Sequence, residues 1–319
     1  MEQIYTYGKY LTNKFGCKVY KVGINISGFT CPNIDGTVAK GGCTFCENDS
    51  FSASTGQTQE LKSFHLNLNS KENPYLEKQL QQLELQFNDI SKRQATEYGA
   101  KKFLVYFQSF TNTYAPFETL KALYDKALSF PNVVGLSIGT RSDSITDETL
   151  DYLAKLNEDK EIWIEFGIQS IYDETLKKIN RGHDSNNVKE WILKSKEKGL
   201  NVCGHLIFGL PDETKEMMLE TSEQAYKWGI DSVKYHPLYV VKRTALANDF
   251  TKGAFVPISE DDYLDVLVKS IKMKPDNVSV QRVTAGIDDN SLLGPDWCKN
   301  KNIQIKNINN ALKPHGLKY

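Results

Sequence analysis

The chain has 319 residues, of which 40% are hydrophobic and 25% are charged, and its net charge is −1. This composition is typical of a soluble globular protein and argues against a protein that coats nucleic acid with its whole surface. No apolar run reaches the ~20 residues of a membrane helix, and the N-terminus lacks the apolar stretch of a signal peptide. We therefore expect a cytoplasmic protein without membrane attachment; the sequence leaves its oligomeric state open.

Short apolar runs alternate with amphipathic helical patterns along most of the chain. Pro74 opens one of these helices, and another, after the third strand, has Thr146 as its N-cap. Strands are predicted at 21–27, 103–107, 133–138, 163–168, 203–208 and 232–238. Six β/α units with short connections are typical of a parallel sheet with right-handed crossovers. We therefore predict an α/β fold, an incomplete (β/α)6 barrel of the TIM type.

The last quarter of the chain changes character. It contains a helix capped by Ser259, an apolar strand candidate at 278–283 and a lysine-rich tail. We expect residues 1–240 to form the barrel, including the N-terminal strand and the cysteine loop. Residues 241–319 are expected to form a small C-terminal extension that packs on the barrel.

Alternation along the strands places polar or small residues on one face of five of them. In the fourth strand, for example, Glu165 and Gln169 alternate with isoleucine and phenylalanine. Buried parallel strands are normally apolar on both faces, so the repeated polar face predicts a shared cavity that opens at the carboxyl ends. Candidates to line its substrate side are Tyr106, Gln108, Glu165, His205, Lys234 and His236.

The sequence assigns no proton donor among these candidates. Lys234 and His236 would suit an anionic substrate group, but an ion pair between Lys234 and Glu165 explains the lysine equally well. An internal ion pair between Glu165 and Arg141 is a further possibility.

Three cysteines cluster after the first strand. Eleven residues separate Cys31 from Cys43, and Cys46 follows after two more. In a reducing compartment such a group indicates a metal or redox site. Iron–sulfur cubanes take thiolate ligands, usually four, and three would leave one iron open to another molecule. Zinc also favours Cys-x-x-Cys but needs a fourth ligand, and the nearest downstream histidine, His65, lacks paired spacing. Spacing thus favours a cluster over zinc, and the isolated cysteines are read as buried or incidental: Cys17, Cys203 and Cys298.

Positive charge is concentrated near both ends of the chain. Residues 297–319 contain five lysines and no acidic residue, and residues 9–21 contain four lysines interleaved with aromatic residues. Such segments could hold an RNA backbone and stack on its bases. Solvated lysine on two terminal segments explains the same pattern, so charge leaves both readings open.

The cysteine segment, with its Cys-x-Phe-Cys ending, resembles that of radical S-adenosylmethionine (SAM) enzymes. The resemblance covers essentially the whole chain and points to the YhcC-like branch, related to the catalytic subunit of Elongator and to oxygen-independent coproporphyrinogen oxidase. The family's commonest motif has three residues between its first two cysteines, whereas eleven are characteristic of this branch. Further motifs follow in the expected order: YFQSFTNTYAP (106–116), GTRSD (139–143), FGIQS (166–170), INRGHD (179–184) and HLIFGLPDET (205–214).

The resemblance implies a [4Fe-4S] cluster on the three cysteines, with SAM bound to the open iron. It places Phe45 near the adenine, and it implies SAM contacts by Ser109, Thr111, Asn112, Gln169 and Arg181. The chain departs from relatives at two positions, where Gly139 replaces a glutamate and His205 replaces an aspartate. His205 is kept as a cofactor-binding candidate, and Glu165, on the inner face, could compensate.

Radical SAM enzymes use an electron from the reduced cluster to cleave SAM into methionine and a 5′-deoxyadenosyl radical. The resemblance therefore implies an electron donor such as flavodoxin or ferredoxin. Relatives in the Elongator direction modify the C5 side chain of the wobble uridine of tRNA. Because no acetyltransferase domain follows the barrel, we expect maturation of an existing side chain, such as conversion of carboxymethylaminomethyluridine to aminomethyluridine.

Two alternatives remain open. A radical SAM enzyme could act on a small metabolite or a porphyrin-like acid and would not bind tRNA. A non-catalytic RNA-binding module stabilised by zinc would contain neither iron nor sulfide and would not cleave SAM.

Overall fold

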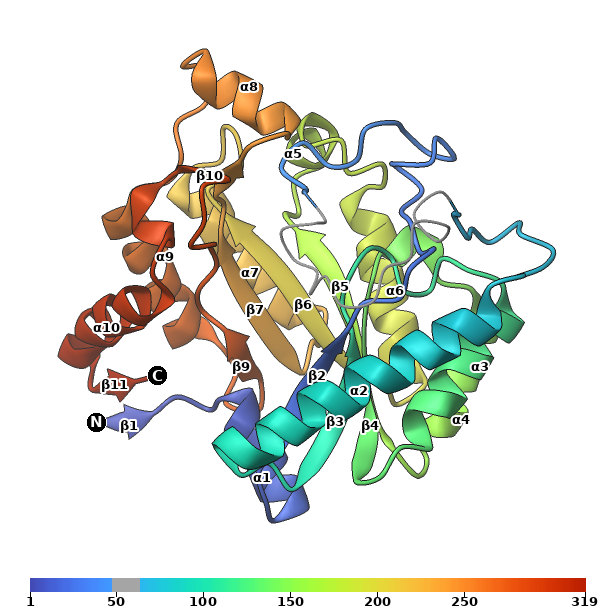
Figure 1. Ribbon diagram of the computed structural model, residues 1–319. Coiled ribbons are helices and arrows are strands. Elements are labelled where there is room, and N and C mark those ends of the chain that lie inside the picture. Colours follow the sequence, from blue (N-terminus) through green and yellow to red (C-terminus); the bar gives the residue numbers. More distant parts are fainter. Residues whose placement is uncertain (48–63) are drawn as a thin grey trace.

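A curled sheet of seven parallel strands forms the centre of the computed structural model, which describes residues 1–47 and 64–319 (Figure 1). In spatial order the strands are β2 (Val19–Ile24), β3 (Lys102–Phe107), β4 (Val133–Thr140), β5 (Glu161–Gln169), β6 (Asn201–Phe208), β7 (Ser232–Pro237) and β9 (Ser279–Arg282). The first six follow one another in the sheet as they do in the chain, and each neighbouring pair is parallel. The predicted incomplete (β/α)6 barrel is confirmed.

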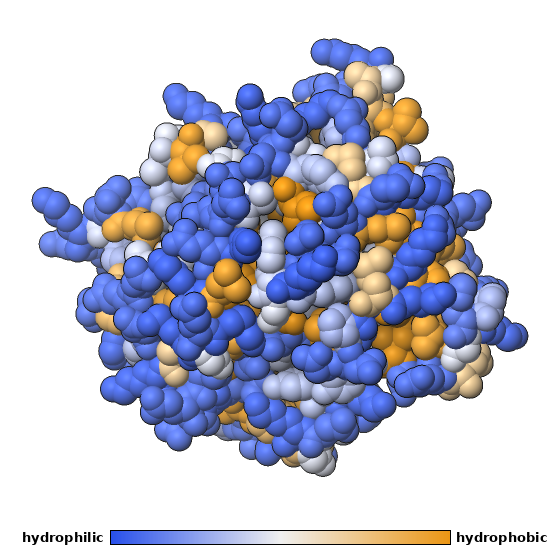
Figure 2. All heavy atoms as spheres, turned by 180° about the vertical axis from the view of Figure 1, so that it is seen from behind, coloured by the Kyte–Doolittle hydropathy of each residue, from blue (hydrophilic) through white to orange (hydrophobic). Residues whose placement is uncertain are grey.

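Helices between the strands cover the outer face of the sheet. They are α2 (Leu76–Tyr98), α3 (Phe117–Leu128), the 3-10 turn η3 (Ser142–Ser144), α4 (Asp147–Leu156), α5 (Asp173–Lys178), α6 (Ser185–Glu197) and α7 (Lys215–Lys227). The side chain of Thr146 accepts from the backbone of Thr149 and caps α4, as predicted. Ile164 and Phe166 of β5 are fully buried. Seen from behind, the molecule is mostly hydrophilic, with hydrophobic side chains in small separate groups (Figure 2).

A row of glutamines on α2 satisfies the backbone that continues β2 towards the cysteines. Gln86 accepts from Asn25 N at 3.0 Å and donates to Asn25 O at 2.8 Å, and Gln82 accepts from Ser27 N at 2.9 Å. β2 is an edge strand, whose open backbone groups would otherwise need other partners. The strand ends at Ile24, earlier than predicted, because side chains rather than a neighbouring strand bond residues 25–27.

The C-terminal region adds a strand to the sheet and helices beside it. β9 lies within the strand candidate at 278–283 and pairs with β7, so this region contributes to the barrel wall. The remaining elements are β8 (Val240–Val241), α8 (Ala245–Thr251), α9 (Glu260–Met273), β10 (Leu292–Gly294), η4 (Asp296–Cys298), α10 (Lys301–Leu312), η5 (Lys313–His315) and β11 (Leu317–Lys318). Ser259 caps α9, as predicted, and α9 packs between α7 and α10.

The N-terminal segment closes the end of the barrel where the strands begin. β1 (Glu2–Gln3) pairs with β11, which brings the two termini together, and α1 (Tyr7–Phe15) follows (Figure 1). Tyr7 and Tyr10 pack edge-on against Trp163, with ring centroids 5.0 and 5.5 Å away. Lys14 forms an ion pair with Glu161. Part of the basic stretch at 9–21 therefore stabilises the barrel from the end opposite its mouth. None of the helices in the described residues has the length and hydrophobicity of a membrane span.

Candidate active site

The three grouped cysteines lie in a loop beyond the carboxyl end of β2. Ile34 N donates to Cys31 O at 2.9 Å and Cys46 N donates to Cys43 O at 3.0 Å, so tight turns position the loop. All three thiols are free, and all three residues line one cavity of about 190 Å³. The structure therefore brings together the cysteines that the spacing singled out.

A turn after α5 holds this cysteine loop in place. Asn180 Nδ2 donates to Lys40 O at 3.0 Å and to Gly42 O at 2.7 Å. From the loop itself, Asn33 Nδ2 donates to Asn180 O at 3.1 Å and lies 3.3 Å from Cys43 Sγ. Sequence reasoning did not single out these two asparagines, although Asn180 lies in the INRGHD motif and Asn33 between the first two cysteines.

The spacing of the sulfurs bears on which metal they suit. Ligand sulfurs on one tetrahedral zinc lie about 3.8 Å apart, given Zn–S bonds of about 2.3 Å. In residues 1–47 and 64–319, one group of three His, Cys, Asp or Glu side chains has its ligand atoms within 4.8 Å of one another: Glu165, Cys203 and His205. Cys31, Cys43 and Cys46 do not form such a compact group, as the ligands of a single zinc ion would.

Polar groups surround the thiols. Thr111 Oγ1 donates to Cys31 Sγ at 3.0 Å, and Arg181 Nη1 lies 3.8 Å from Cys43 Sγ. Burial raises the pKa of Cys31 to about 11, although the Thr111 hydroxyl and the nearby arginines act in the opposite direction. A bound metal centre would hold the thiols as thiolates.

Several polar atoms at this cavity are buried without a hydrogen-bond partner in the described chain. They are Ser109 Oγ, Arg141 Nη1, Gln169 Oε1 and Arg181 Nε, and all four residues line the cavity. An unsatisfied buried polar group costs about 1–3 kcal/mol, so four around one cavity fit a polar ligand such as SAM. Asn112 differs, because its side chain donates to Gly139 O at 2.9 Å and it is not among the residues that line the cavity.

Gln169 has a strained backbone at the end of β5. Its φ of 66° is in the left-handed region, and the pairing with β6 shifts register between Gly167 and Gln169. A Cβ on Gly167 would lie 2.6 Å from Gln169 Nε2 and 2.7 Å from Arg181 Nη2. Glycine at 167 thus makes room for both polar side chains at the cavity.

A buried ionic network lies on the inner face of the barrel. The carboxylate of Glu165 forms ion pairs with Lys21 and Lys234, lies 2.7 Å from His205 Nε2 and accepts from Ser137 Oγ at 2.5 Å. Burial alone would raise the pKa of Glu165, but the two lysines and the histidine hold it well below its usual value. The predicted polar interior is confirmed. Of the two partners that the sequence suggested for Lys234, an anionic substrate group or Glu165, the structure shows Glu165.

Two features of the network differ from the sequence analysis. Arg141 does not pair with Glu165; its guanidinium bonds both carboxylate oxygens of Asp143, at 2.8 and 2.6 Å, and Arg181 O at 2.6 Å. Lys21, and not Arg141, pairs with Glu165. The sequence analysis treated Lys21 only as part of the basic stretch at 9–21, although its position on the first predicted strand indicated that its side chain could point inwards.

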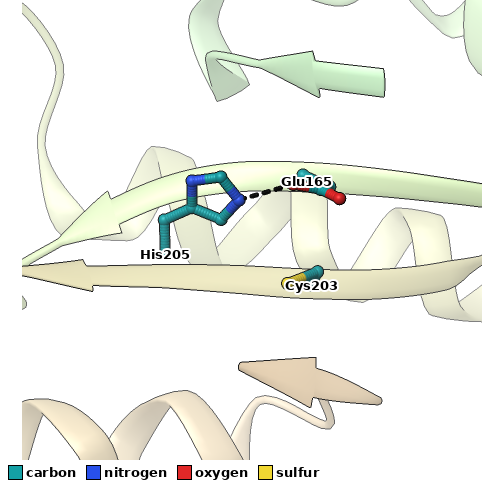
Figure 3. Close-up of side chains that lie close together, drawn as sticks. All are labelled: Glu165, Cys203 and His205. Atoms are coloured by element: carbon teal, nitrogen blue, oxygen red, sulfur yellow. Dashed lines mark hydrogen bonds and ion pairs between the residues drawn. The ribbon is translucent and has the colours of Figure 1, made fainter. Parts of the chain in front are cut away.

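Glu165, Cys203 and His205 lie close enough together to suggest a metal site (Figure 3). Lys21 and Lys234 already bond the Glu165 oxygens, however, so a cation there would face two ammonium groups. Cys203 is fully buried, and burial raises its pKa to about 12. Its side chain packs in a hydrophobic cluster with Tyr7 and Trp163, near the end of the barrel where the strands begin, as expected for an isolated cysteine.

A second cavity of about 330 Å³ adjoins the first. Five of the predicted residues line both cavities: Phe45, Tyr106, Gln108, Gln169 and His205. His236 lines only the second cavity. Lys234 lines neither cavity, and its Nζ donates to Tyr106 OH, at the cavity wall, at 3.0 Å. Tyr239, Arg282 and Lys301 complete the second cavity and were not predicted. Arg282 and Lys301 belong to the region expected to form the C-terminal extension, and Tyr239 follows the end of β7, so strand alternation in the barrel could not identify them.

Comparisons with known proteins agree with this geometry. A sequence model of the radical SAM superfamily matches residues 36–225, and one of the radical SAM C-terminal domain matches residues 230–314. YtqA of Bacillus subtilis is 35% identical to this chain, in an alignment that covers 99% of this chain and 91% of YtqA. YhcC of Escherichia coli is also 35% identical, and its alignment covers 98% of this chain and 93% of YhcC. A tRNA uridine(34) acetyltransferase of Methanocaldococcus infernus is 29% identical over 48% of this chain and 29% of its own. The solved structure of the Elp3 protein of that archaeon has a similar fold (TM-score 0.63, 19% identity, covering 94% of this chain and 64% of that one).

Proposed function

The chain belongs to the radical SAM superfamily, and from this premise we propose that it modifies the C5 side chain of the wobble uridine of tRNA. Members of the family use a [4Fe-4S] cluster and SAM. When bound, these cofactors supply a 5′-deoxyadenosyl radical that abstracts a hydrogen atom from the substrate.

The chain's own residues bind and orient these groups. Cys31, Cys43 and Cys46 hold the cluster, and Asn180 keeps their loop against the barrel. The unpaired atoms of Ser109 and the three other cavity side chains are positioned to satisfy the polar groups of SAM. Phe45 lies where the two cavities meet, between the cysteines and the second cavity, which takes the substrate.

One observation carries the tRNA proposal: the sequence similarity to a protein named as a tRNA uridine(34) acetyltransferase, together with the Elp3-like fold over 94% of the chain. The match to the acetyltransferase covers about half of this chain and 29% of that protein, so we propose the same kind of substrate with different chemistry. The specific reaction proposed is oxidative removal of the carboxymethyl group from 5-carboxymethylaminomethyluridine. Its methylene group would lose a hydrogen atom and then an electron, and water would hydrolyse the resulting imine to aminomethyluridine and glyoxylate, with SAM as the two-electron oxidant. A flavodoxin or ferredoxin supplies the electron.

Exposed lysines near the C-terminus support contact with RNA. Lys306, Lys313 and Lys318 are exposed and form no ion pair with the described residues. Truncation of this segment would also remove Ile308 and Leu312, which are buried in the core, so substitution is the cleaner test. Replacing the three lysines by glutamine should weaken tRNA binding and reduce its salt dependence. Unchanged affinity would remove this segment from the proposed interface.

The decisive experiment is mass spectrometry of tRNA nucleosides from cells with the gene, without it, and complemented with Cys43→Ala or Cys17→Ser. We expect the carboxymethylaminomethyl nucleoside to accumulate without the gene and with Cys43→Ala, but not with Cys17→Ser. Cys17 lies outside the cysteine loop and controls for the loss of a thiol. Identical profiles in all four strains, under conditions where the gene is expressed, would refute the tRNA proposal.

A further inference from the structure

The substrate cavity carries positive charge that the chain does not balance. Arg282 and Lys301 both line it, and no aspartate or glutamate is among the described residues of its wall. Neither side chain forms an ion pair with another described residue. Asp288 and Asp289 line a neighbouring hollow that Lys301 also lines, but neither forms an ion pair with Lys301 or Arg282.

Lys234, the lysine first considered for an anionic substrate, is not available for this role. Its ammonium group is paired with Glu165, and only 4% of its side chain is exposed. Arg282 is the Cα partner of Lys234 where the β7–β9 pairing shifts register, and its side chain lines the cavity. Because β9 is the last strand of the curled sheet, Arg282 reaches the cavity from a wall with no such acid.

The two cations are close enough to influence each other. Burial and the charge of Arg282 both lower the pKa of Lys301. Two like charges facing one partly desolvated cavity are unfavourable unless an anion lies between them. His236 adds a further polar atom, because its Nε2 is buried with no partner in the described chain.

We propose that Arg282 and Lys301, together with His236, form a recognition site for an oxyanionic group of the substrate, a carboxylate or a phosphate. The site lies in the second cavity, while the cysteines line only the first. An anchor at this end holds the rest of the substrate towards Gln169 and His205, where the cavities join. The inference rests on the proposed function only in taking this cavity as the substrate site.

Small probes test the site without nucleic acid. N-benzylglycine carries a carboxylate, and N-benzylglycinamide has the same shape without it; benzyl phosphate and benzyl alcohol form the corresponding phosphate pair. We would measure their binding to the cluster-loaded protein with SAM by equilibrium dialysis. For wild type we expect at least one anion to bind about tenfold more tightly than its neutral analogue, as for a charge-assisted hydrogen bond of about 1.4 kcal/mol. The pair showing the larger preference identifies whether carboxylate or phosphate is recognised.

Variants locate the site. Arg282→Gln and Lys301→Gln should each abolish most of this preference, and both residues are exposed, so folding should be retained. Lys299→Gln is the matched control, because Lys299 is exposed, lies two residues before Lys301 and pairs with Asp296. A wild-type protein without preference for either anion, or a preference that survives in both variants, would overturn the proposal. Since the probes contain no nucleoside, these results are independent of the tRNA profile, which tests the proposed function alone.

Discussion

Glu165 on β5 and Lys234 on β7 form an ion pair across β6, the strand that lies between theirs. The side chains are 0% and 4% exposed, so water contributes little to the solvation of either charge. Lys21, which lies on β2, forms an ion pair with the other carboxylate oxygen of Glu165. One carboxylate at the wall of the first cavity therefore connects the edge strand of the sheet with strands on its far side.

Replacing Glu165 by glutamine should destabilise the protein strongly, because two buried ammonium groups lose their counterion. We expect the free energy of unfolding to fall by about 3–5 kcal/mol, measured by urea denaturation under anaerobic conditions. Glu223→Gln is the control, since it removes the exposed i,i+4 partner of Lys227 and should cost at most about 1 kcal/mol. Equal effects of the two substitutions would show that the network is better solvated than the structure indicates.

The pH dependence of stability should include a contribution from His205. Burial and the charge of Lys234 lower its pKa to about 4, despite Glu165, whereas an unfolded histidine titrates near about 6.5. Between these values the unfolded chain binds a proton that the folded chain does not, so stability falls as the pH decreases from about 6.5 to about 4. His205→Gln should reduce the dependence of the unfolding free energy on pH, relative to wild type, by an amount equivalent to up to one bound proton. Urea unfolding at several pH values within this window measures both slopes; an unaltered slope in His205→Gln contradicts the assignment.

Adding one methyl group at Gly167 should impair SAM binding without loss of the cluster. The new Cβ would lie 2.6 Å from Gln169 Nε2 and 2.7 Å from Arg181 Nη2, so both side chains must move. We expect Gly167→Ala to weaken SAM binding at least about tenfold, equivalent to about 1.4 kcal/mol, with iron and sulfide content near wild type. Gly8→Ala in α1 adds the same group where the nearest atom is 4.0 Å away and should bind SAM normally. Wild-type affinity in Gly167→Ala would exclude this cavity wall from SAM recognition.

Asn180 should control how firmly the cluster is retained. Asn180→Ala removes two hydrogen bonds to the cysteine loop, at Lys40 O and Gly42 O, and leaves the three thiols unchanged. Each bond contributes about 0.5–1.5 kcal/mol, so iron release to a chelator should accelerate roughly tenfold. Asn157→Ala is a matched control, because Asn157 also makes two side-chain bonds to the backbone, at Gly199 and Ile162, far along the chain from the loop. If the two variants release iron at the same rate, the turn does not stabilise the loop.

Local patterns in the sequence were sufficient for the cysteines and for the inner face of the barrel. Strand alternation is a property of the extended backbone, so it predicts that Glu165 points away from Ile164 without knowledge of any neighbour. Similarly, the short Cys43–Cys46 spacing brings two thiols into one tight turn wherever that turn lies. These features depend only on residues within a few positions of one another.

Only the tertiary structure decided which residues meet across the barrel. Lys21 reaches Glu165 because the curl of the sheet sets the distance between β2 and β5, which are not neighbours in the sheet. Arg282 joins the second cavity because β9 pairs with β7, a long-range contact that no local periodicity encodes. The grouping of the cysteines could thus be predicted from the sequence alone, whereas the positive charge that Arg282 brings to the second cavity arises from strand pairing.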